Sequence, residues 1–178
     1  MNQAIYKICI LGDGGVGKTT FVARYLTGVF NEQLKITIGV NFYIKKFEFR
    51  QNMVTLQIWD FAGEDRFRFI LPSYLLGAVG ALFMYDITRF SSFRNFNNWM
   101  EVFKEGSKRN ENSMPLFMVG SKKDLEYKRA VSLEDAMSIT EKYDEVNDYI
   151  ECSAKTGENI ELIFEKLIEL IMKRQGLI

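Results

Sequence analysis

The sequence predicts an α/β protein in which helices cover both faces of a six-stranded, mostly parallel sheet with one antiparallel edge strand. Apolar runs of strand length alternate along the chain with segments of helical periodicity. Residues 79–85 are uninterrupted by polar alternation, as in a strand buried on both faces. A glycine-rich loop over residues 12–19 follows the first strand and opens the first helix. These three observations indicate one domain over residues 1–178.

The first half of the chain contains a strand, a helix and a hairpin. Residues 4–11 are an apolar run that predicts the first strand, and residues 18–26 form the first turns of a helix. Two β-rich segments, 39–50 and 53–60, are separated by residues 51–52. Apolar and polar side chains alternate along the second segment, so this pair predicts the antiparallel edge of the sheet.

Five elements follow the central run. A helix with Ser91 or Ser92 as its N-cap carries an aromatic stripe, and a strand covers residues 116–119. Ser132 begins a pattern similar to a capping box, which predicts a helix to about residue 143. A short strand over 149–152 precedes the closing amphipathic helix, whose apolar residues are Ile160, Phe164, Leu167 and Ile171.

Composition excludes several classes of function. Lysine plus arginine equals aspartate plus glutamate, at 23 each, which argues against nucleic acid as a partner. The chain has no histidine, so no imidazole serves as metal ligand or general base. Cys9 and Cys152 lie in strand patterns and are expected to be buried free thiols, which suits a cytoplasmic protein. We expect neither a signal peptide nor a membrane-spanning segment.

The glycine-rich loop matches the phosphate-binding pattern G-x-x-x-x-G-K-[ST] from Gly12 to Thr19. Its glycines let successive backbone N–H groups point at phosphate oxygens, and the following helix presents its positive end to the same anion. Lys18 can reach the β and γ phosphates, and the Thr19 hydroxyl can bind the accompanying Mg²⁺. The loop therefore predicts a nucleotide ligand.

Four further motifs, at residues 37–42, 59–64, 121–124 and 152–155, follow this loop in a fixed order. Together the five motifs resemble the Ras superfamily of small GTPases, and the motif Ile38-Gly39-Val40-Asn41-Phe42 resembles the Rab branch. The resemblance extends from about residue 6 to residue 172. It implies a P-loop NTPase fold, the G domain, and a GTP/GDP molecular switch of the kind used in vesicle trafficking.

The resemblance also implies roles for individual residues. Thr19, Thr37 and Asp60 would hold Mg²⁺, the last through water, and Asp124 would select guanine over adenine. Hydrolysis would depend on Glu64, Lys18, Thr37 and Gly63. The residues implied in binding GTP or GDP are Asp13, Gly14, Gly15, Val16, Gly17, Lys18, Thr19, Thr20, Phe30, Thr37, Gly63, Ser121, Lys122, Asp124, Leu125, Ser153, Ala154 and Lys155.

The chain departs from the family pattern at three positions. Glu64 replaces the glutamine that orients the attacking water, and an ionised carboxylate cannot donate a hydrogen bond, so we expect slow hydrolysis. Ser121 replaces an asparagine with a shorter group, so we expect weaker binding and faster exchange. Phe61 stands where a threonine is common in the family, and the sequence gives no firm physical reason for the aromatic side chain. No residue is an evident arginine finger, and Gly14 leaves room for one from an activating protein.

Protein partners are expected at two switch segments, about residues 30–40 and 62–74, which would contact effectors, exchange factors and activating proteins. The aromatic residues Phe42, Trp59 and Tyr74 form either an effector patch or ordinary core. We expect a monomer that binds no nucleic acid. Membrane attachment stays open, because the sequence carries no prenylation motif at its carboxyl end. The location would be the cytoplasm or the cytosolic face of a membrane.

Two other functions compete with a hydrolysing switch. Glu64 and Ser121 favour a GTP-binding scaffold with negligible hydrolysis. A metabolic P-loop kinase is the third reading, but no segment resembles the arginine-bearing lid that such enzymes close over the phosphates.

Overall fold

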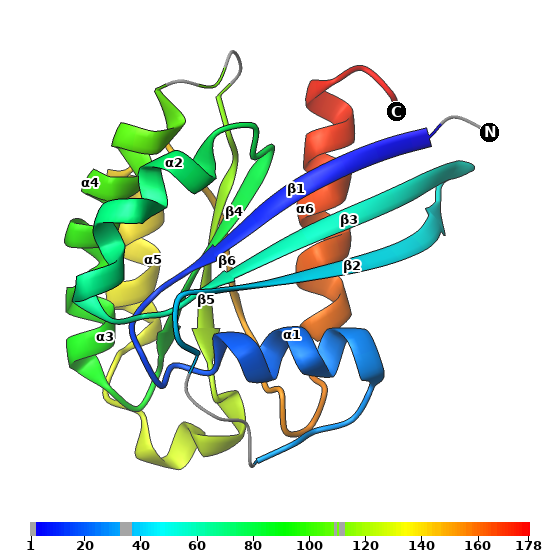
Figure 1. Cartoon of the computed structure of the whole chain (residues 1–178). Coiled ribbons are helices and arrows are strands. Elements are labelled where there is room, and N and C mark those ends of the chain that lie inside the picture. Colours follow the sequence, from blue (N-terminus) through cyan, green and yellow to red (C-terminus); the bar gives the residue numbers. More distant parts are fainter. Residues whose placement is uncertain (1–2, 33–36, 109, 111–112) are drawn as a thin grey trace.

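The computed structural model describes residues 3–32, 37–108, 110 and 113–178, and these form a six-stranded sheet between two layers of helices (Figure 1). The strand order is β2-β3-β1-β4-β5-β6, and β2 is antiparallel to β3 whereas the other neighbours are parallel. This confirms the predicted fold class. The strands are β1 (Gln3–Leu11), β2 (Val40–Phe49), β3 (Asn52–Phe61), β4 (Gly80–Asp86), β5 (Leu116–Ser121) and β6 (Val146–Glu151). The helices are α1 (Lys18–Thr27), α2 (Leu71–Leu75), α3 (Phe90–Arg94), α4 (Phe96–Ser107), α5 (Leu133–Lys142) and α6 (Ile160–Arg174), with 3₁₀ turns η1 (Asp65–Ile70) and η2 (Lys123–Lys128).

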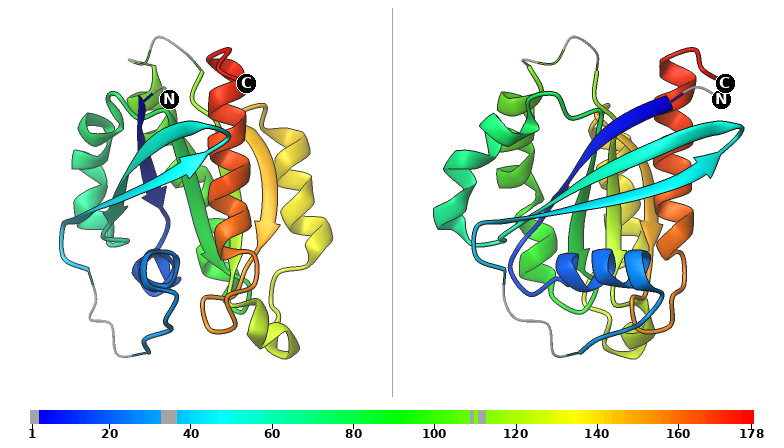
Figure 2. Two further views of the ribbon diagram at one scale, coloured as in Figure 1. Left: turned by 90° about the vertical axis from the view of Figure 1, so that its right-hand side faces the viewer. Right: turned by 45° about the vertical axis from the view of Figure 1, so that its right-hand side comes forward.

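Two hydrophobic cores lie on opposite faces of the sheet. Ile8 and Ile10 of β1 pack into the core shared with α1 and α6, whereas Cys9 and Leu11 pack into the core shared with α2 to α5. Figure 2 shows α1 and α6 together on one side of the sheet. Successive side chains of a strand point to opposite faces, so a strand buried on both faces must be apolar at nearly every position. This accounts for the apolar runs at residues 8–11 of β1 and 80–85 of β4.

The hairpin turn lies one residue earlier than the sequence suggested. Arg50 and Gln51 occupy the turn, with φ angles of 46° and 64°. A two-residue turn with both φ angles positive matches the right-handed twist of the flanking strands. Asn52 begins β3, and its side-chain amide donates to the Arg50 carbonyl at 2.9 Å.

Several helix and strand boundaries differ from prediction. Neither Ser91 nor Ser92 caps a helix: α3 begins at Phe90, and the buried Ser92 hydroxyl accepts the Asp86 N–H at 3.0 Å. The predicted single helix is interrupted at Asn95, and β6 begins at Val146, three residues early. The sequence also missed η1, α2 and η2. The cap at Ser132 is confirmed, since its hydroxyl accepts the Asp135 N–H at 3.0 Å.

The loops that follow β1, β3, β4, β5 and β6 all leave the carboxyl edge of the parallel strands, beside the start of α1. Figure 1 shows α1, η2 and the loop after β6 gathered at this end, while β1 begins and α6 ends at the other. This edge is where an open parallel sheet places its ligands. Within the described part of the chain, every helix is too short or too polar to cross a membrane.

Candidate functional site

A cavity of about 430 Å³ opens at the carboxyl edge of the sheet. Its walls come from the glycine-rich loop at residues 12–19, which we call the phosphate loop, and from the start of α1. The loops after β3, β5 and β6 complete them. Segments more than 130 residues apart in sequence, from Gly14 to Ala154, therefore face one space. The predicted site residues that line it are Gly14, Gly15, Val16, Gly17, Lys18, Thr19, Thr20, Phe30, Thr37, Gly63, Glu64, Ser121, Lys122, Leu125 and Ala154.

Lys18 lies beneath the phosphate loop with 6% of its surface exposed. Its ammonium donates to the carbonyl oxygens of Gly12 at 2.7 Å and Asp13 at 2.8 Å. Burial lowers the pKa of Lys18 to about 8, and the charges of Asp60 and Asp13 oppose that shift. The loop thus places a cation beside the cavity, held by carbonyl groups that carry no full charge of their own.

Gly63 meets the phosphate loop at very close range. The Gly14 N–H donates to the Gly63 carbonyl at 3.1 Å. A Cβ atom on Gly63 would lie 2.1 Å from both the Asp13 carbonyl carbon and the Gly14 nitrogen. Only glycine permits this approach. The backbone of the phosphate loop therefore requires glycine at this position.

Three oxygen-bearing side chains gather between α1, β3 and the first switch segment. The Thr19 hydroxyl donates to Asp60 Oδ2 at 2.5 Å and lies 2.6 Å from the Thr37 hydroxyl. Asp60 is fully buried, and its Oδ1 atom has no hydrogen-bond partner among the described residues. Burial raises the pKa of Asp60, and the Thr19 hydrogen bond and the Lys18 charge oppose that shift.

This cluster fits Mg²⁺. The ion prefers hard oxygen ligands and commonly binds through one carboxylate together with hydroxyls, waters and phosphate oxygens. A buried carboxylate oxygen without a partner carries a desolvation cost that a cation or its bound water would remove. Thr19, Thr37 and Asp60 therefore have the donor set that the family resemblance assigns to the metal.

The far end of the cavity is bounded by the loops after β5 and β6. Asp124 accepts a hydrogen bond from the buried Ser153 hydroxyl at 2.6 Å, which orients its carboxylate. The Ser121 hydroxyl lies 2.6 Å from the Val16 carbonyl and 2.8 Å from the Tyr85 carbonyl. The Ser121 side chain therefore connects the loop after β5 to the phosphate loop.

Lys122 connects three parts of the site. Its ammonium pairs with Asp86 at 2.6 Å and donates to the Gly15 carbonyl at 3.1 Å. The Lys122 backbone is left-handed, with φ of 64°, at the start of η2. Hydrogen bonds from Lys122 and Thr88 lower the pKa of Asp86 although burial opposes them, so Asp86 keeps its charge beside Lys122.

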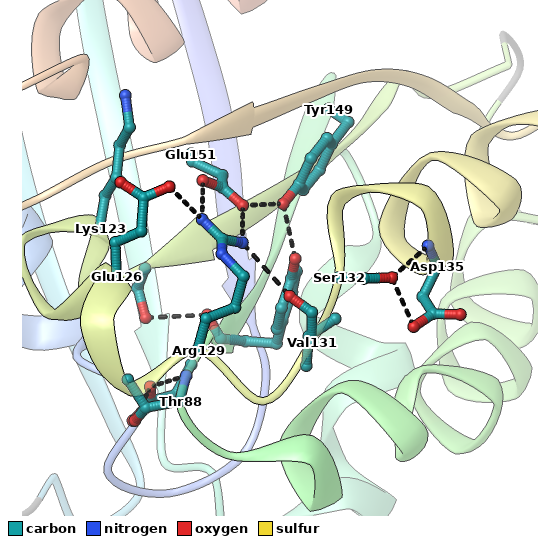
Figure 3. A network of polar contacts seen from close by, with 12 residues as sticks. Thr88, Lys123, Glu126, Arg129, Val131, Ser132, Asp135, Tyr149 and Glu151 are labelled. Carbon is teal, nitrogen blue, oxygen red and sulfur yellow. Dashed lines mark hydrogen bonds and ion pairs between the residues drawn. The ribbon is translucent and has the colours of Figure 1, made fainter.

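A partly buried ion pair joins the two loops at this end (Figure 3). The Arg129 guanidinium, just after η2, binds both carboxylate oxygens of Glu151, at 2.6 and 2.8 Å. The Tyr149 hydroxyl also donates to Glu151 at 2.6 Å and lies 2.6 Å from the Tyr85 hydroxyl. Because Glu151 immediately precedes the loop of Ser153 and η2 carries Asp124, the pair fixes one loop relative to the other.

Five predicted site residues do not line the cavity: Asp13, Asp60, Asp124, Ser153 and Lys155. The Asp13 carboxylate points instead toward α4 and η1, where it accepts from Asn95 at 2.7 Å, Trp99 at 2.8 Å and Arg68 at 3.3 Å. Only its backbone carbonyl faces Lys18. Lys155 is exposed. Nucleotide binding by Asp13 stays a prediction, and the side chain of Asp13 is directed away from the cavity.

The aromatic residues near the switch segments form one cluster. Phe42 and Trp59 have ring centroids 4.8 Å apart, and Trp59 and Tyr74 5.4 Å apart. Phe42 is 45% exposed. Phe61 is buried beneath Tyr74, edge to face at 5.5 Å, which accounts for its bulk. The part of the first switch segment at residues 33–36 lies outside the described residues.

Neither Arg89 nor Arg129 was predicted from the sequence to belong to the site. The Arg89 guanidinium donates to the Gly14 carbonyl at 2.6 Å, so a cation of this chain does reach the phosphate loop. Its position three residues after β4, at the carboxyl edge, was the available signal. Arg129 carried no comparable signal, since its partner Glu151 is 22 residues away.

Comparison with known proteins gives consistent matches along the chain. Residues 7–173 match the sequence model of the Ras family. The chain is 37% identical to Ras-related protein RABA1g of Arabidopsis thaliana and 38% identical to Ras-related protein Rab11B of Nicotiana tabacum. Each match covers 95% of this chain and 76% of the relative. Ras-related protein SEC4 of Candida albicans is 36% identical over 96% of this chain and 79% of its own length.

Proposed function

This chain belongs to the Ras family of small GTPases and is Rab-like, and on that premise we propose that it binds guanine nucleotide with Mg²⁺ and hydrolyses GTP to GDP slowly. It would act as one domain over residues 1–178 and as a monomeric molecular switch. The carrying observation is that the residues of all five family motifs gather around one cavity at the carboxyl edge of the sheet.

The phosphates would bind at the phosphate loop. Lys18 is a buried cation whose present partners are neutral carbonyls, so its charge is available to an anion. The backbone of the glycine-rich loop and the first turn of α1 add N–H donors and a positive helix end. Mg²⁺, held by Thr19, Thr37 and water on Asp60, would neutralise charge on the β and γ phosphates.

Guanine would be selected at the other end of the cavity. Asp124 is oriented by Ser153, so a carboxylate is available to accept both the N1–H and the exocyclic amine of guanine. Adenine does not present those two donors in that arrangement, and a site left with an unpaired carboxylate rejects it. Lys122 and Phe30 would pack along the base, and Leu125 and Ala154 complete this wall.

Hydrolysis would be slow because of Glu64. This residue lines the cavity beside Gly63, where the attacking water would lie. An ionised carboxylate can accept a proton from water but cannot donate a hydrogen bond to the phosphoryl oxygens. It would also bring negative charge close to the γ-phosphoryl group, which is itself negatively charged. A second candidate function, a GTP-binding scaffold with negligible turnover, is favoured by the same residue.

Effectors, exchange factors and activating proteins would bind the switch segments at about 30–40 and 62–74. Several large apolar side chains of this region are exposed, including Ile38 at 75% and Phe69 at 79%. Together with Phe42 they offer an apolar surface whose arrangement would follow the bound nucleotide. Vesicle trafficking is the process that the Rab resemblance suggests.

The first experiment identifies the nucleotide that copurifies with the protein, by chromatography after denaturation, and then compares exchange of fluorescent GTP and ATP analogues. Guanine nucleotide and exclusive exchange of the GTP analogue are expected. Adenine nucleotide, or equal binding of both analogues, would overturn the proposal. Single-turnover GTP hydrolysis in excess Mg²⁺ over hours then separates the slow switch, which converts its GTP, from the scaffold, which does not.

A further inference from the structure

Side chains hold five successive carbonyl groups of the phosphate loop. Lys18 binds those of Gly12 and Asp13. The next three accept from Arg89, Lys122 and Ser121, at 2.6, 3.1 and 2.6 Å respectively. The carbonyls in question are those of Gly12, Asp13, Gly14, Gly15 and Val16.

Holding a carbonyl also orients the next N–H. In a trans peptide the C=O of one residue and the N–H of the following residue point in opposite directions, and no described peptide bond of this chain is cis. The Gly14 carbonyl points at Arg89, which does not line the cavity, whereas Gly15 does. The Gly15 N–H therefore points away from Arg89, and Gly15 itself borders the cavity in which phosphate would bind.

Among the side chains named above that donate to these carbonyl groups, Arg89 alone lies outside the five motifs. It precedes α3, its side chain is partly buried, and one guanidinium nitrogen lies 3.4 Å from the position of a Cβ atom on Gly15. Gly14 is thereby fixed on both sides, since its N–H donates to the Gly63 carbonyl and its C=O accepts from Arg89. A link thus runs from β4 through the phosphate loop to the second switch segment.

We propose that Arg89 is a positioning residue for the nucleotide phosphates, which acts by holding the Gly14–Gly15 peptide so that its N–H is directed at the anion. This inference rests on the proposed function. A Gly-Gly segment is costly to order because glycine has the widest backbone freedom of any residue. A charge-assisted hydrogen bond that orders it before the ligand arrives lowers the cost of binding.

The test uses Arg89→Ala, Arg89→Gln and Arg89→Lys, with Arg94→Ala as the control. Arg94 is an exposed arginine of α3, five residues further on. Dissociation of fluorescent GDP and competition by GDP and GMP are measured for each variant, and thermal melting checks folding. Arg89→Ala should release GDP roughly tenfold faster, the factor expected for a lost hydrogen bond to a charged group. Arg94→Ala should match the parent protein.

Two further comparisons separate positioning from other roles. The affinity loss of Arg89→Ala should be larger for GDP than for GMP, because the oriented N–H acts on the phosphate chain. Arg89→Gln, which is neutral but keeps a donor, should be closer to the parent than Arg89→Ala. Equal affinity losses for GDP and GMP would overturn the proposal. Parental affinity in Arg89→Lys together with no recovery in Arg89→Gln would also overturn it, because the positive charge alone would then account for the effect.

The outcome for the parent protein tests the proposed function separately. A parent that binds neither GDP nor GTP contradicts the proposed function and this inference together. A parent that binds GDP while Arg89→Ala releases it at the parental rate contradicts the role of Arg89 alone.

Discussion

Replacing Glu151 by glutamine should destabilise the protein and make the loops after β5 and β6 less ordered. Glu151 accepts two hydrogen bonds from Arg129 and one from Tyr149, and the exposed fractions of the Arg129 and Glu151 side chains are only 18% and 8%. Glutamine keeps the volume and one acceptor oxygen but removes the charge. Among the described residues, Arg129 then keeps Glu126 as its charged partner, at 3.3 Å and with a side chain 63% exposed, and it keeps its hydrogen bond to the Val131 carbonyl at 3.2 Å.

The magnitude follows from this geometry. Removing one partner of a fully buried ion pair costs about 3–5 kcal/mol, since the other charge stays buried without compensation. Partial exposure of Arg129 and its remaining contact with Glu126 reduce that figure, so we expect a loss of about 2–3 kcal/mol in the free energy of unfolding. For a domain of this size, each kcal/mol lowers the melting temperature by roughly 2–4 °C.

Urea unfolding followed by the fluorescence of Trp59 and Trp99 measures the loss, with the same nucleotide load in every sample because bound ligand adds stability. The control is Lys166→Ala, which breaks the exposed pair of Lys166 with Asp148 and should cost less than about 1 kcal/mol. A Glu151→Gln variant as stable as this control would refute the reasoning. GDP should also dissociate faster from Glu151→Gln, and not from Lys166→Ala.

The stability lost in Glu151→Gln should depend on pH and should be smaller in acid. Burial alone would raise the pKa of Glu151, but hydrogen bonds from Arg129 and Tyr149 outweigh it and hold the pKa below its ordinary value. The folded protein therefore binds fewer protons here than the unfolded chain does. The stabilisation is complete above the ordinary glutamate pKa of about 4.3 and is lost as pH falls through the lower folded-state value. The difference between parent and Glu151→Gln should shrink in that acid range, and a difference that grew there would contradict this assignment.

Three substitutions test the cavity itself. Glu64→Gln should hydrolyse GTP on the order of tenfold faster in single turnover, the effect of one added hydrogen bond in the transition state, and a rate equal to the parent would contradict the role of Glu64. Ser121→Asn should release GDP about fivefold more slowly if the amide adds one contact worth roughly 1 kcal/mol, whereas an unchanged rate would refute the expected weakness of serine. Gly63→Ala should lose about 1–3 kcal/mol of stability, because its Cβ would overlap the Asp13 backbone, while Gly14→Ala, with open space around its Cβ, should melt like the parent.

The architecture and the place of the cavity follow from local sequence patterns. The period of apolar residues distinguishes strands from helices, and alternation marks the hairpin. Parallel strands with connecting helices must end at one edge, so motifs that follow strands meet there. The sequence could not locate η1, α2 or η2, because short turns of helix lack a full period. It predicted Ser91 or Ser92 as a helix cap, whereas α3 begins at Phe90 and the buried Ser92 hydroxyl accepts the Asp86 N–H.

The sequence by itself determined which residue types stand in the five motifs, since each motif is a contiguous run. Only the tertiary structure decided which side chains support them. Arg89 and Gly14 are 75 residues apart, Trp99 and Asp13 are 86 apart, and Ser121 and Val16 are 105 apart. No local pattern encodes such pairings, because they depend on the packing of β4, α4 and β5 beside β1. The loop that matches the phosphate-binding pattern can thus be recognised in the sequence, but the side chains that bind its carbonyl groups are brought to it only when the sheet is assembled.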